Sequence, residues 1–516
     1  MPLKFNGSLQ ATQLFEALCS FAADLDNLCP SLRPCCFVSV TSNDGFDFPS
    51  AQNFVCANTT PAALKALVLP AQTSVSVTFY LECAEICVTP LQEQCYQILD
   101  ALSSKLHLFL HPYLPWGATT STEPFVIASP AGFVRCVLTH GQIPQFQLEL
   151  EHLDHTKRAL VEQAWTRALH AFLLPQTSVM QLDLDSFFSA SGHCAQPSMS
   201  QSAVSSSSIS QGSILYSPPS EQTFSLQALV PDAQVAEQIG TVQQAMKEGE
   251  CYLLNLSLRA QVPCSAGLFT MASLLREWVK RKSRFGICYS SQSCKILSFS
   301  PERFVAVEAG WILAEPIKGT NSALPGCELG LEQAQQLWNS HKERHEQTLV
   351  VDLLRNDLNC ICEPGSVDVV RPFFARRTQT LLQMQSFVVG KVNAGLSLSR
   401  FFLNLLPAGS VTGTPKKRVC EIISEVELTP RGYYTGLFAV LEQGRCAESV
   451  LLIRTLFGNA YQNHNECTVG VGAGITTLSD AHLEIAEFKL KLLSFAALGS
   501  NSEKIGRNNA EGEVIS

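Results

Sequence analysis

The feature that most constrains the fold is a mostly apolar run from Cys251 to Leu258, which follows a stretch with helical periodicity from Val235 to Met246. A short turn, residues 248–250, separates the two. The apolar run indicates a buried strand, because its length and composition suit a strand that is covered by other elements. The sequence therefore predicts a mixed α/β protein in which helices pack against sheets.

Two hairpins are predicted further along the chain, at residues 285–299 and 304–313, because strand-like runs flank turn residues there. The second hairpin leads to Lys318, which lies between Pro316 and Gly319 at the expected mouth of that hairpin. Proline stiffens the backbone before the lysine and glycine frees it afterwards, so the chain can present one amine at a fixed position. The alternative is an ordinary, solvated loop lysine.

The length and charge of the chain restrict its class. Its 516 residues, 46% of them hydrophobic, can bury a large core in two or more domains or in one oversized α/β unit. The net charge is −9 and the pI is near 5.7, so no electrostatic footprint for nucleic acid or an anionic membrane is present. Local basic clusters then require local anions, and a small anionic ligand is the natural candidate.

The twenty cysteines are scattered without a C-x-x-C pair or the Cys and His spacing of a zinc site. We therefore expect reduced thiols in the core. The N-terminus lacks an apolar signal core, and no later run approaches the ~18 apolar residues that a membrane span requires. These observations predict a cytoplasmic protein.

Composition divides the chain into four predicted segments. Residues 1–188 mix helical and strand-like stretches and are expected to be an α/β region that is part of the same overall fold. Residues 189–221 are rich in Ser, Gln, Gly and Pro, which predicts a mobile loop or linker. Residues 222–497 form the predicted catalytic region. The last segment, 498–516, is expected to be a disordered tail.

Two pairs of glutamates, each spaced three residues apart on a predicted helix, are candidate metal ligands. Glu343 and Glu346 lie within the helical stretch 331–356, and Glu484 and Glu487 lie in a helix near the C-terminus. Carboxylates at this spacing are neighbours and repel each other unless a cation lies between them. A divalent cation held by a few carboxylates, with positions left open for a ligand, suits Mg²⁺. The alternative is a pair of solvated helix faces.

The C-terminal helix, predicted from Asp480 to Phe495, has a core stripe of apolar residues at helical spacing. Glu484, Glu487 and Lys491 fall together beside this stripe, because offsets of three and seven residues lie within a ~60° arc. We therefore expect that face to border the core rather than open water.

Two glycine-bearing turns are predicted between the acidic pairs. The first, Pro407 to Arg418, is not a P-loop and is expected to start a helix, with Thr414 as N-cap and Pro415 at the first helical position. The cations at 416–418 oppose the helix dipole, so a nearby anion would relieve them. The second, Gly470 to Gly474, has the wrong spacing for a dinucleotide loop and favours close approach of the backbone to a ligand.

Two further charged residues, Arg454 and Glu302, are candidates for a binding or catalytic site. Arg454 is predicted to lie among apolar neighbours in a strand from Ser449 to Leu456, where a half-buried arginine requires a carboxylate partner. Glu302 places a carboxylate sixteen residues before Lys318.

The region from about Gln222 to Phe495 resembles the chorismate-utilising enzymes, which include the anthranilate, isochorismate, salicylate and aminodeoxychorismate synthases. The resemblance covers more than half of the chain and rests on motifs in the family's order. These motifs are residues 249–252, 300–304, 316–320, 351–357, 407–416 and 453–455 and the terminal helix with its glutamates. The resemblance implies an α/β (α+β) fold, a sandwich of two antiparallel-rich sheets with outer helices as in anthranilate synthase component I.

Within this family, position 318 separates subgroups, because anthranilate synthases usually carry alanine where this chain has Lys318. Lysine is typical of component I of the aminodeoxychorismate synthases, which supply para-aminobenzoate for folate biosynthesis. The resemblance implies that Lys318 attacks C2 of chorismate as the 4-hydroxyl leaves, and that ammonia then adds at C4 and expels the lysine. It also implies that Glu302 is the general acid that protonates the departing hydroxyl.

The resemblance further implies that Glu346 and Glu487 hold Mg²⁺, with Glu343 and Glu484 supporting the ion through bound water. The ion would anchor the ring carboxylate of chorismate and neutralise its charge.

The substrate contacts implied by the resemblance are spread over four segments. Gly319 and Thr320 would line the ring, and Gln383 would contribute to substrate positioning. The enolpyruvyl carboxylate would be received by Arg454, by Lys491 and by backbone amides near Gly472 to Gly474.

Two positions depart from the family pattern. Leu253 occupies a position where relatives carry glutamine or a catalytic lysine, so the water-activating base of isochorismate and salicylate synthases is absent. Gln383 occupies a position where histidine is usual, and an amide can donate a hydrogen bond but cannot be protonated. The alternatives are anthranilate synthase component I and a degenerate subunit without catalytic activity.

No glutaminase nucleophile motif is visible in the sequence. Ammonia is therefore expected from solution or from a separate glutamine amidotransferase subunit, component II.

Overall fold

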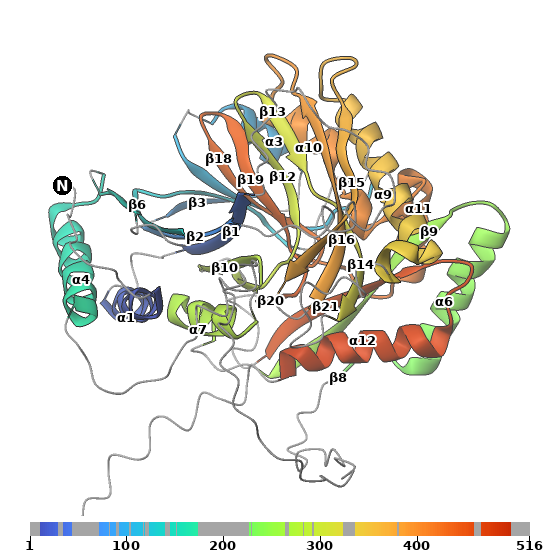
Figure 1. The fold of residues 1–516 in the computed structure, drawn as a ribbon, viewed down its shortest axis with the longest axis horizontal. Helices are drawn as coiled ribbons and strands as arrows, with labels where there is room; N and C mark the ends of the chain where they lie inside the picture. The colour runs from blue at the N-terminus through green and yellow to red at the C-terminus, as the bar shows by residue number, and fades with distance from the viewer. Residues whose placement is uncertain are drawn as a thin grey trace, which may run out of the picture.

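The chain folds into two antiparallel sheets with helices on their outer sides (Figure 1). The computed structural model describes residues 11–28, 35–43, 72–81, 83–88, 92–102, 105–116, 118, 123–139, 145–150, 152–173, 227–228, 230–263, 268–281, 283–291, 294–322, 336–378, 381–458 and 466–496. The predicted Ser-rich loop at 189–221 and the predicted tail at 498–516 lie outside the described residues.

The described strands form two ladders. The first sheet has the order β17 (Gly413–Thr414), β9 (Leu253–Pro263), β21 (Glu466–Ile475), β20 (Thr455–Gly458), β11 (Lys295–Ser298), β10 (Phe285–Ser290), β1 (Cys35–Asn43), β2 (Gln72–Leu81), β6 (Gly132–Thr139) and β7 (Gln145–Glu149), with β8 (Gln227–Ala228) also paired to β9. The second sheet has the order β14 (Ile317–Ser322), β16 (Leu381–Lys391), β13 (Trp311–Ala314), β12 (Arg303–Glu308), β19 (Arg445–Leu451), β18 (Leu437–Glu442), β4 (His107–His111), β5 (Phe125–Ser129) and β3 (Ala84–Val88), with β15 (Asp368–Thr378) also paired to β16.

The helices fall into two groups according to the sheet that they cover. Residues of α1 (Ala11–Leu28), α4 (His155–Leu173), α6 (Asp232–Lys247), α7 (Met271–Arg281), α11 (Lys416–Val426) and α12 (Ala481–Ala496) share a buried cluster with the first sheet. Residues of α3 (Gln92–Asp100), α9 (His341–Asn359) and α10 (Leu398–Leu405) share one with the second sheet. No helix within the described residues is long and apolar enough to cross a membrane.

Strand β1 shows how alternating side chains divide the core. Cys36 and Val38 belong to the cluster under the outer helices, whereas Cys35 and Phe37 belong to a third cluster between the sheets. The Phe37 ring packs against Phe438 of β18 with 5.3 Å between the ring centroids. Because successive side chains of a strand point to opposite faces, each sheet can pack against the other sheet and against helices.

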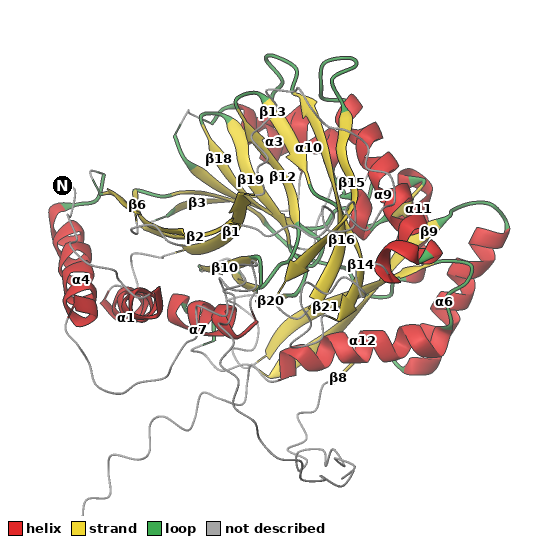
Figure 2. Cartoon of the chain, viewed as in Figure 1, coloured by secondary structure: helices red, strands yellow, loops and turns green. Residues whose placement is uncertain are grey.

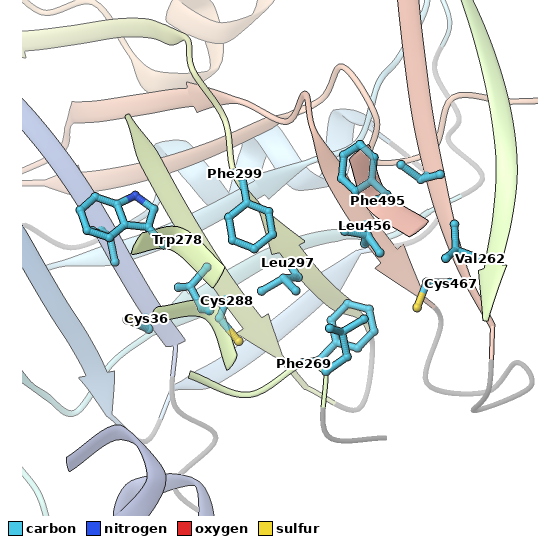
Figure 3. Close-up of a cluster of buried hydrophobic side chains, with 14 of the residues drawn as sticks. Cys36, Val262, Phe269, Trp278, Cys288, Leu297, Phe299, Leu456, Cys467 and Phe495 are labelled. Atoms are coloured by element: carbon cyan, nitrogen blue, oxygen red, sulfur yellow. The ribbon is translucent and has the colours of Figure 1, made fainter. Parts of the chain in front are cut away.

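The buried cluster between the first sheet and its outer helices is continuous across the strands of that sheet. Figure 3 shows Cys36 of β1, Leu297 of β11 and Leu456 of β20 in the same layer as Trp278 of α7 and Phe495 of α12. The molecule thus consists of helices, sheet, sheet and helices in succession, with strands yellow and helices red in Figure 2. This arrangement confirms the predicted sandwich of antiparallel sheets with outer helices.

Strands from both ends of the chain are interleaved in each sheet. In the first sheet β1 pairs with β10, with Phe37 opposite Ile287. In the second sheet β4 pairs with β18, with Phe109 opposite Ala439. The described parts of residues 1–188 and 222–497 therefore share both sheets.

Several predicted elements are confirmed by the structure. Helix α1 (Ala11–Leu28) lies in the region predicted to mix helical and strand-like stretches, and α6 and β9 follow each other as the sequence indicates. The hairpins β10–β11 and β12–β13 are both antiparallel pairs. The long apolar periodicities were sufficient to predict these elements.

Three local predictions are wrong. The stretch Ser449 to Leu456 is not one strand, because β19 and β20 belong to different sheets and the chain crosses between them at residues 452–454. The run Gly470 to Gly474 is not a turn but part of strand β21, because its glycines alternate with apolar residues that pack in the core. Lys318 lies within strand β14 and not at the mouth of a hairpin.

The expectation of reduced core thiols holds only in part. Cys467 forms a disulfide, although the other described cysteines are free. Cys87 and Cys360 are exposed and do not lie in the core. Sequence spacing reports local motifs, whereas disulfide formation depends on proximity in space.

Candidate active site

Lys318 lies on β14, at the edge of the second sheet, where it pairs with Met384 of β16. The register of this ladder shifts between Lys318 and Thr320, so Gly319 marks a β-bulge. Bulges re-aim the side chains beside them. The Lys318 side chain is partly buried, which is not the position of a solvated loop lysine.

The backbone just before Lys318 is held by helix α9. The carbonyl oxygen of Pro316 accepts a hydrogen bond from Nε2 of Gln347 at 3.1 Å and another from the backbone N–H of Ser386 at 3.3 Å. Gln347 is fully buried and also donates to the Ser386 hydroxyl at 2.9 Å. These bonds fix β14 against the helix that carries Glu343 and Glu346.

Strand β21 presents three glycines on the face opposite the outer helices. A Cβ on Gly470 would lie only 2.1 Å from Cγ of Tyr434. A Cβ on Gly472 would lie 2.7 Å from the Tyr434 hydroxyl and 2.8 Å from Nδ2 of Asn255. Only glycine allows side chains to approach the strand this closely.

Gly474, the third of these glycines, marks the point where several predicted site residues meet. The position of its Cβ would lie 3.4 Å from Oε2 of Glu346, 3.8 Å from Nζ of Lys318 and 3.4 Å from Cδ1 of Leu253. Helix α9 and strands β14 and β9 thus bring a carboxylate, an amine and an apolar side chain to one place on the backbone of β21.

The amides of Gly472 and Gly474 point away from β9. Their partners across the ladder, Ser257 and Asn255, donate their own N–H groups at 2.8 and 2.7 Å to acceptors outside the strand pair. In an antiparallel ladder, residues whose N–H groups point away from the partner strand form non-hydrogen-bonded pairs. The backbone N–H and C=O groups of both glycines therefore face the other edge of β21, away from β9.

That opposite edge is only partly covered. Strand β20 pairs with β21 at Thr468 and Val469 and no further. Beyond it, Nζ of Lys491 donates to the carbonyl oxygen of Gly472 at 2.6 Å, and Nζ also pairs with Oε1 of Glu487 at 2.6 Å. Lys491 therefore lies beside the glycine segment, and the reception of a carboxylate by these groups stays a prediction.

Glu302 is buried directly before β12 and keeps its proton more readily than an ordinary glutamate. Desolvation raises the pKa of this carboxyl to about 7, opposed by a hydrogen bond from Ser410 and by the charges of Lys318 and Arg284. A carboxyl with a pKa near neutrality can donate a proton at physiological pH. The influence of Lys318 on this carboxyl means that both predicted catalytic residues belong to one electrostatic environment.

The four predicted metal ligands differ in burial. Glu346 is 7% and Glu484 is 5% exposed, whereas Glu343 is partly buried and the Glu487 side chain is 51% exposed and paired with Lys491. The expectation that the whole Glu484 to Lys491 face borders the core is therefore wrong for Glu487, because that residue lies at the rim of the helix.

The carboxylates fit Mg²⁺ in their chemistry. No three His, Cys, Asp or Glu side chains within the described part of the chain are arranged as a metal cluster. Mg²⁺ usually uses one or two carboxylates together with water and substrate oxygens, so the predicted ligands Glu346 and Glu487 suit it without a third protein carboxylate. The ion and its ligands stay a prediction.

Arg454 lies in the crossing between the sheets, with a left-handed φ of 51°. Its side chain is exposed and not half-buried as predicted, because Arg454 lies outside the strands, although desolvation by neighbouring protein lowers its pKa. The predicted carboxylate partner is absent among the described residues. An exposed arginine without a carboxylate partner in the described part of the chain is suited to bind an anionic ligand.

Gln383 is buried on β16, directly opposite Thr320 of β14 and next to Met384, the partner of Lys318. Gly319 and Thr320 follow the lysine on the same strand. The sheet therefore places all these predicted substrate-binding positions beside Lys318.

The turn before α11 uses protein carboxylates rather than a ligand. Nζ of Lys416 contacts Oδ2 of Asp357 at 2.5 Å, and Arg418 pairs with Glu250 at 2.9 Å. The anion predicted to relieve these cations is therefore supplied by the chain itself. Helix α11 begins at Lys416 with Pro415 as its N-cap, one residue later than predicted.

Two residues in the site were not predicted. Ser410, in the short 3₁₀ turn η2 (Gly409–Val411), bonds to Glu302. Tyr434 covers Gly470 and Gly472 with its ring and hydroxyl. The alternation of glycines was a usable signal for Tyr434, because a glycine face on a strand implies a bulky neighbour.

Comparisons with known proteins identify the family to which the chain belongs. The profile of the family described as chorismate binding enzyme matches residues 133–497. Aminodeoxychorismate synthase component 1 of Klebsiella aerogenes is 33% identical over 265 residues, which cover 49% of this chain and 56% of that protein. Anthranilate synthase component 1 1 of Haloarcula marismortui is 32% identical over 254 residues, which cover 49% of this chain and 50% of that protein. The matched part thus spans about half the length of these curated relatives.

Solved structures share the fold. Anthranilate synthase component I of Streptococcus pneumoniae superposes with a TM-score of 0.53 at 20% identity, covering 80% of each chain. The menaquinone-specific isochorismate synthase of Escherichia coli superposes with a TM-score of 0.55 at 16% identity, covering 93% of this chain and 99% of the other. The family profile extends over more than half of the chain, from strand β6 to helix α12. The chain therefore belongs to the chorismate binding enzyme family.

Proposed function

We propose that this chain is the synthase component of an aminodeoxychorismate synthase, which converts chorismate and ammonia to 4-amino-4-deoxychorismate for para-aminobenzoate and folate biosynthesis. The observation that carries the proposal is the meeting of Lys318 and Glu346 at Gly474. Glu302 lies within the electrostatic reach of the same lysine. A nucleophilic amine, a general acid and an acidic anchor are the groups that this substitution requires.

The reaction exchanges a hydroxyl for an amine in two displacements. The amine of Lys318 forms a bond to C2 of chorismate, the two conjugated ring double bonds shift toward C4, and the bond from C4 to its hydroxyl oxygen breaks. The oxygen leaves as water with the proton of Glu302. Ammonia then attacks C4, both double bonds shift back, and the lysine amine is expelled from C2, while the new ammonium group returns a proton to the Glu302 carboxylate. The net change is chorismate plus ammonia to aminodeoxychorismate plus water, and Lys318 is regenerated.

The protonation state of Glu302 supports its role. With a pKa raised to about 7 by burial, a substantial fraction of this carboxyl is protonated at neutral pH. After it has donated its proton, the nearby charges of Lys318 and Arg284 stabilise the carboxylate.

The two carboxylates of chorismate have separate receivers in this proposal. Arg454, Lys491 and the amides of Gly472 and Gly474 bind the enolpyruvyl carboxylate, while Gly319, Thr320 and Gln383 border the ring. The ring carboxylate lies toward Glu346 and the other glutamates of α9 and α12. Mg²⁺, when bound by those glutamates, neutralises charge on that carboxylate.

Ammonia is delivered by a separate glutamine amidotransferase in this proposal. The K. aerogenes relative is named a component 1, a name that presupposes another component. The purified chain alone should then use ammonium salts, better at higher pH where free NH₃ increases, and should use glutamine only when a partner is added.

Anthranilate synthase is the second candidate, favoured by the similar identity of the H. marismortui relative. Lys318 argues against it, because the resemblance places alanine there in anthranilate synthases. A degenerate subunit is disfavoured by the burial of Glu302 and Glu346, which would be costly to keep without a function.

The test is incubation of the pure chain with chorismate, Mg²⁺ and ammonium, followed by identification of the product by mass spectrometry. We expect aminodeoxychorismate, with turnover lost in Glu346→Ala and on addition of a chelator. Anthranilate as the main product, or no product from a folded chain, would contradict the proposal.

A further inference from the structure

Four charged residues form a continuous chain of ion pairs beside the candidate site. Nη2 of Arg284 donates to Oε1 of Glu315 at 2.9 Å, and its Nη1 lies 2.7 Å from Oε2. Arg303 contacts the same Oε1 through Nη1 and donates through Nε and Nη2 to the two oxygens of Glu448 at 2.8 Å each. The charges alternate in sign and cancel, so every buried charge has a partner.

This chain of ion pairs joins the two sheets. Arg284 directly precedes β10 of the first sheet, whereas Arg303 begins β12 and Glu315 follows β13 in the second. Glu315 is only 2% exposed. The Phe285 ring lies 5.0 Å from the Arg284 guanidinium and 5.9 Å from that of Arg303, so one aromatic side chain packs against both cations.

The same residues flank both predicted reacting groups. Arg303 directly follows Glu302, and Glu315 precedes Lys318 by three residues with the rigid Pro316 between them. The contact between Arg303 and Glu315 therefore ties together the two backbone segments that carry the general acid and the nucleophile.

The segment of Arg284 also pairs with that of Glu302, because the N–H of Phe285 donates to the carbonyl oxygen of Ser300 at 2.9 Å. The charge of Arg284 therefore acts on Glu302. Within the described part of the chain, the charged groups that influence Glu302 are Lys318 and Arg284, and its hydrogen-bond partner is the Ser410 hydroxyl. Both cations lower the pKa of Glu302, against the larger effect of desolvation. Glu448, at the far end of the chain of ion pairs, has no such influence.

We propose that Glu315 and Arg284 are positioning residues for the amination reaction. Glu315 holds the backbone segments of Glu302 and Lys318 at a fixed distance from each other, and Arg284 places a positive charge close to Glu302. This inference rests on the proposed function. Neither residue touches the substrate. Each acts through a catalytic residue.

The first experiment measures the titration of Glu302 directly. Protein labelled with ¹³C at the glutamate side-chain carboxyls is titrated by NMR, and Glu302→Gln identifies the signal. Wild type should titrate near a pKa of about 7. The pKa should be higher in Arg284→Gln, because a stabilising cation is lost, and close to wild type in Arg284→Lys and in the matched control Glu448→Gln. An unchanged pKa in Arg284→Gln, or an equal shift in Glu448→Gln, would overturn the role of Arg284.

The second experiment separates positioning from stability. Chorismate consumption is measured over a range of pH with total ammonium adjusted to keep free NH₃ constant. Glu315→Gln should lower kcat by about 10-fold to 100-fold, the size expected for a misplacement of reacting groups, with a small change in KM. Arg284→Gln should move the alkaline limb to higher pH. Glu448→Gln should do neither, and a kcat loss in Glu448→Gln equal to that in Glu315→Gln would reduce Glu315 to a structural residue.

Failure of this proposal can be distinguished from failure of the proposed function. If the wild type does not aminate chorismate, the proposed function fails, while the NMR titration still decides the role of Arg284 because it needs no turnover. If Arg284→Gln does not fold, the double variant Arg284→Gln/Glu315→Gln removes both charges of the pair and leaves no unpaired charge between them. It should show the same upward shift of the Glu302 pKa, and an unchanged pKa would contradict the proposal.

Discussion

The interior between the two sheets differs at its two ends. Around β1 and β10 it is filled with large aromatic residues, and the rings of Phe37 and Phe285 stack with 6.2 Å between their centroids. Around β9 and β21 the inner face of the same sheet carries the glycines of β21 and polar side chains such as Asn255. One sheet thus has an apolar end and a polar end on the same face.

The difference teaches how a sandwich of this kind combines stability with a site for chemistry. Large side chains between the sheets supply the hydrophobic stabilisation at one end. At the other end the glycines leave room next to the backbone, and buried charges are held by hydrogen bonds. Arg431, for example, pairs with Glu427 at 2.6 Å and donates to the carbonyl oxygens of Val411 and Asn255 at 2.7 Å. Polar groups at this end are organised before any ligand arrives.

The largest expected effect is at the polar end. Glu302→Gln should lower the rate of chorismate amination by about 10²-fold to 10⁴-fold, the usual contribution of a general acid. The same variant should gain stability at alkaline pH. The folded-state pKa of about 7 lies above the usual 4.5, so the native state binds more protons and wild-type stability falls as pH rises from 4.5 to 7.

The glutamine variant removes this pH dependence. Its advantage in the free energy of unfolding should be near zero at pH 4 and about 3 kcal/mol at pH 8, by the conversion of a pKa difference to free energy. Urea denaturation at the two pH values measures it. Loss of both activity and stability would show that Glu302 is a structural residue.

The next effect is at the apolar end. Phe438→Ala should destabilise the protein by about 3–5 kcal/mol, because a buried ring that packs against Phe37 is replaced by a cavity. Below its unfolding transition the variant should retain a kcat near the wild-type value. Thermal denaturation and a rate measurement at low temperature check this prediction. A loss of kcat without a loss of stability would contradict the claim that the apolar end serves stability and the polar end serves catalysis.

The smallest effects come from two glycines of β21, which form a matched pair. Gly470→Ala places a Cβ 2.1 Å from the Tyr434 ring and should cost about 1–3 kcal/mol, the usual range for overpacking. Gly474→Ala meets its nearest atoms at 3.4 Å, an ordinary contact, and should change stability by less than about 0.5 kcal/mol. It should nevertheless slow turnover, because the methyl group lies beside Lys318 and Glu346. Equal effects of the two substitutions on stability and rate would contradict this account of the glycine face.

The sequence predicted the elements whose signal is local. Helices α1 and α12 and the hairpins β10–β11 and β12–β13 have clear apolar periodicity, and the structure has them. The prediction of a turn at Gly470 to Gly474 is wrong, because a glycine can mark either a turn or the close approach of a neighbour. Only the position of Tyr434 across the strand decides between these readings.

The sequence predicts which residues belong to the candidate site, but it does not predict how they are placed in space. Motifs indicated Lys318, Glu302 and Glu346, which lie on three different elements. Their meeting beside Gly474 depends on long-range strand order, which periodicity does not report. The chain of ion pairs through Glu315 was missed for the same reason, because its members are ordinary charged residues until the two sheets bring them together.

The central claim is that Lys318 is a covalent nucleophile at the polar end of the sandwich. The most direct measurement is mass spectrometry of the acid-quenched protein after incubation with chorismate and Mg²⁺ in the absence of ammonia. We predict a mass increment of chorismate less one water on the peptide that contains Lys318, absent in Lys318→Ala and discharged by ammonium. An adduct on another peptide, or product formed at the wild-type rate by Lys318→Ala, would contradict the claim.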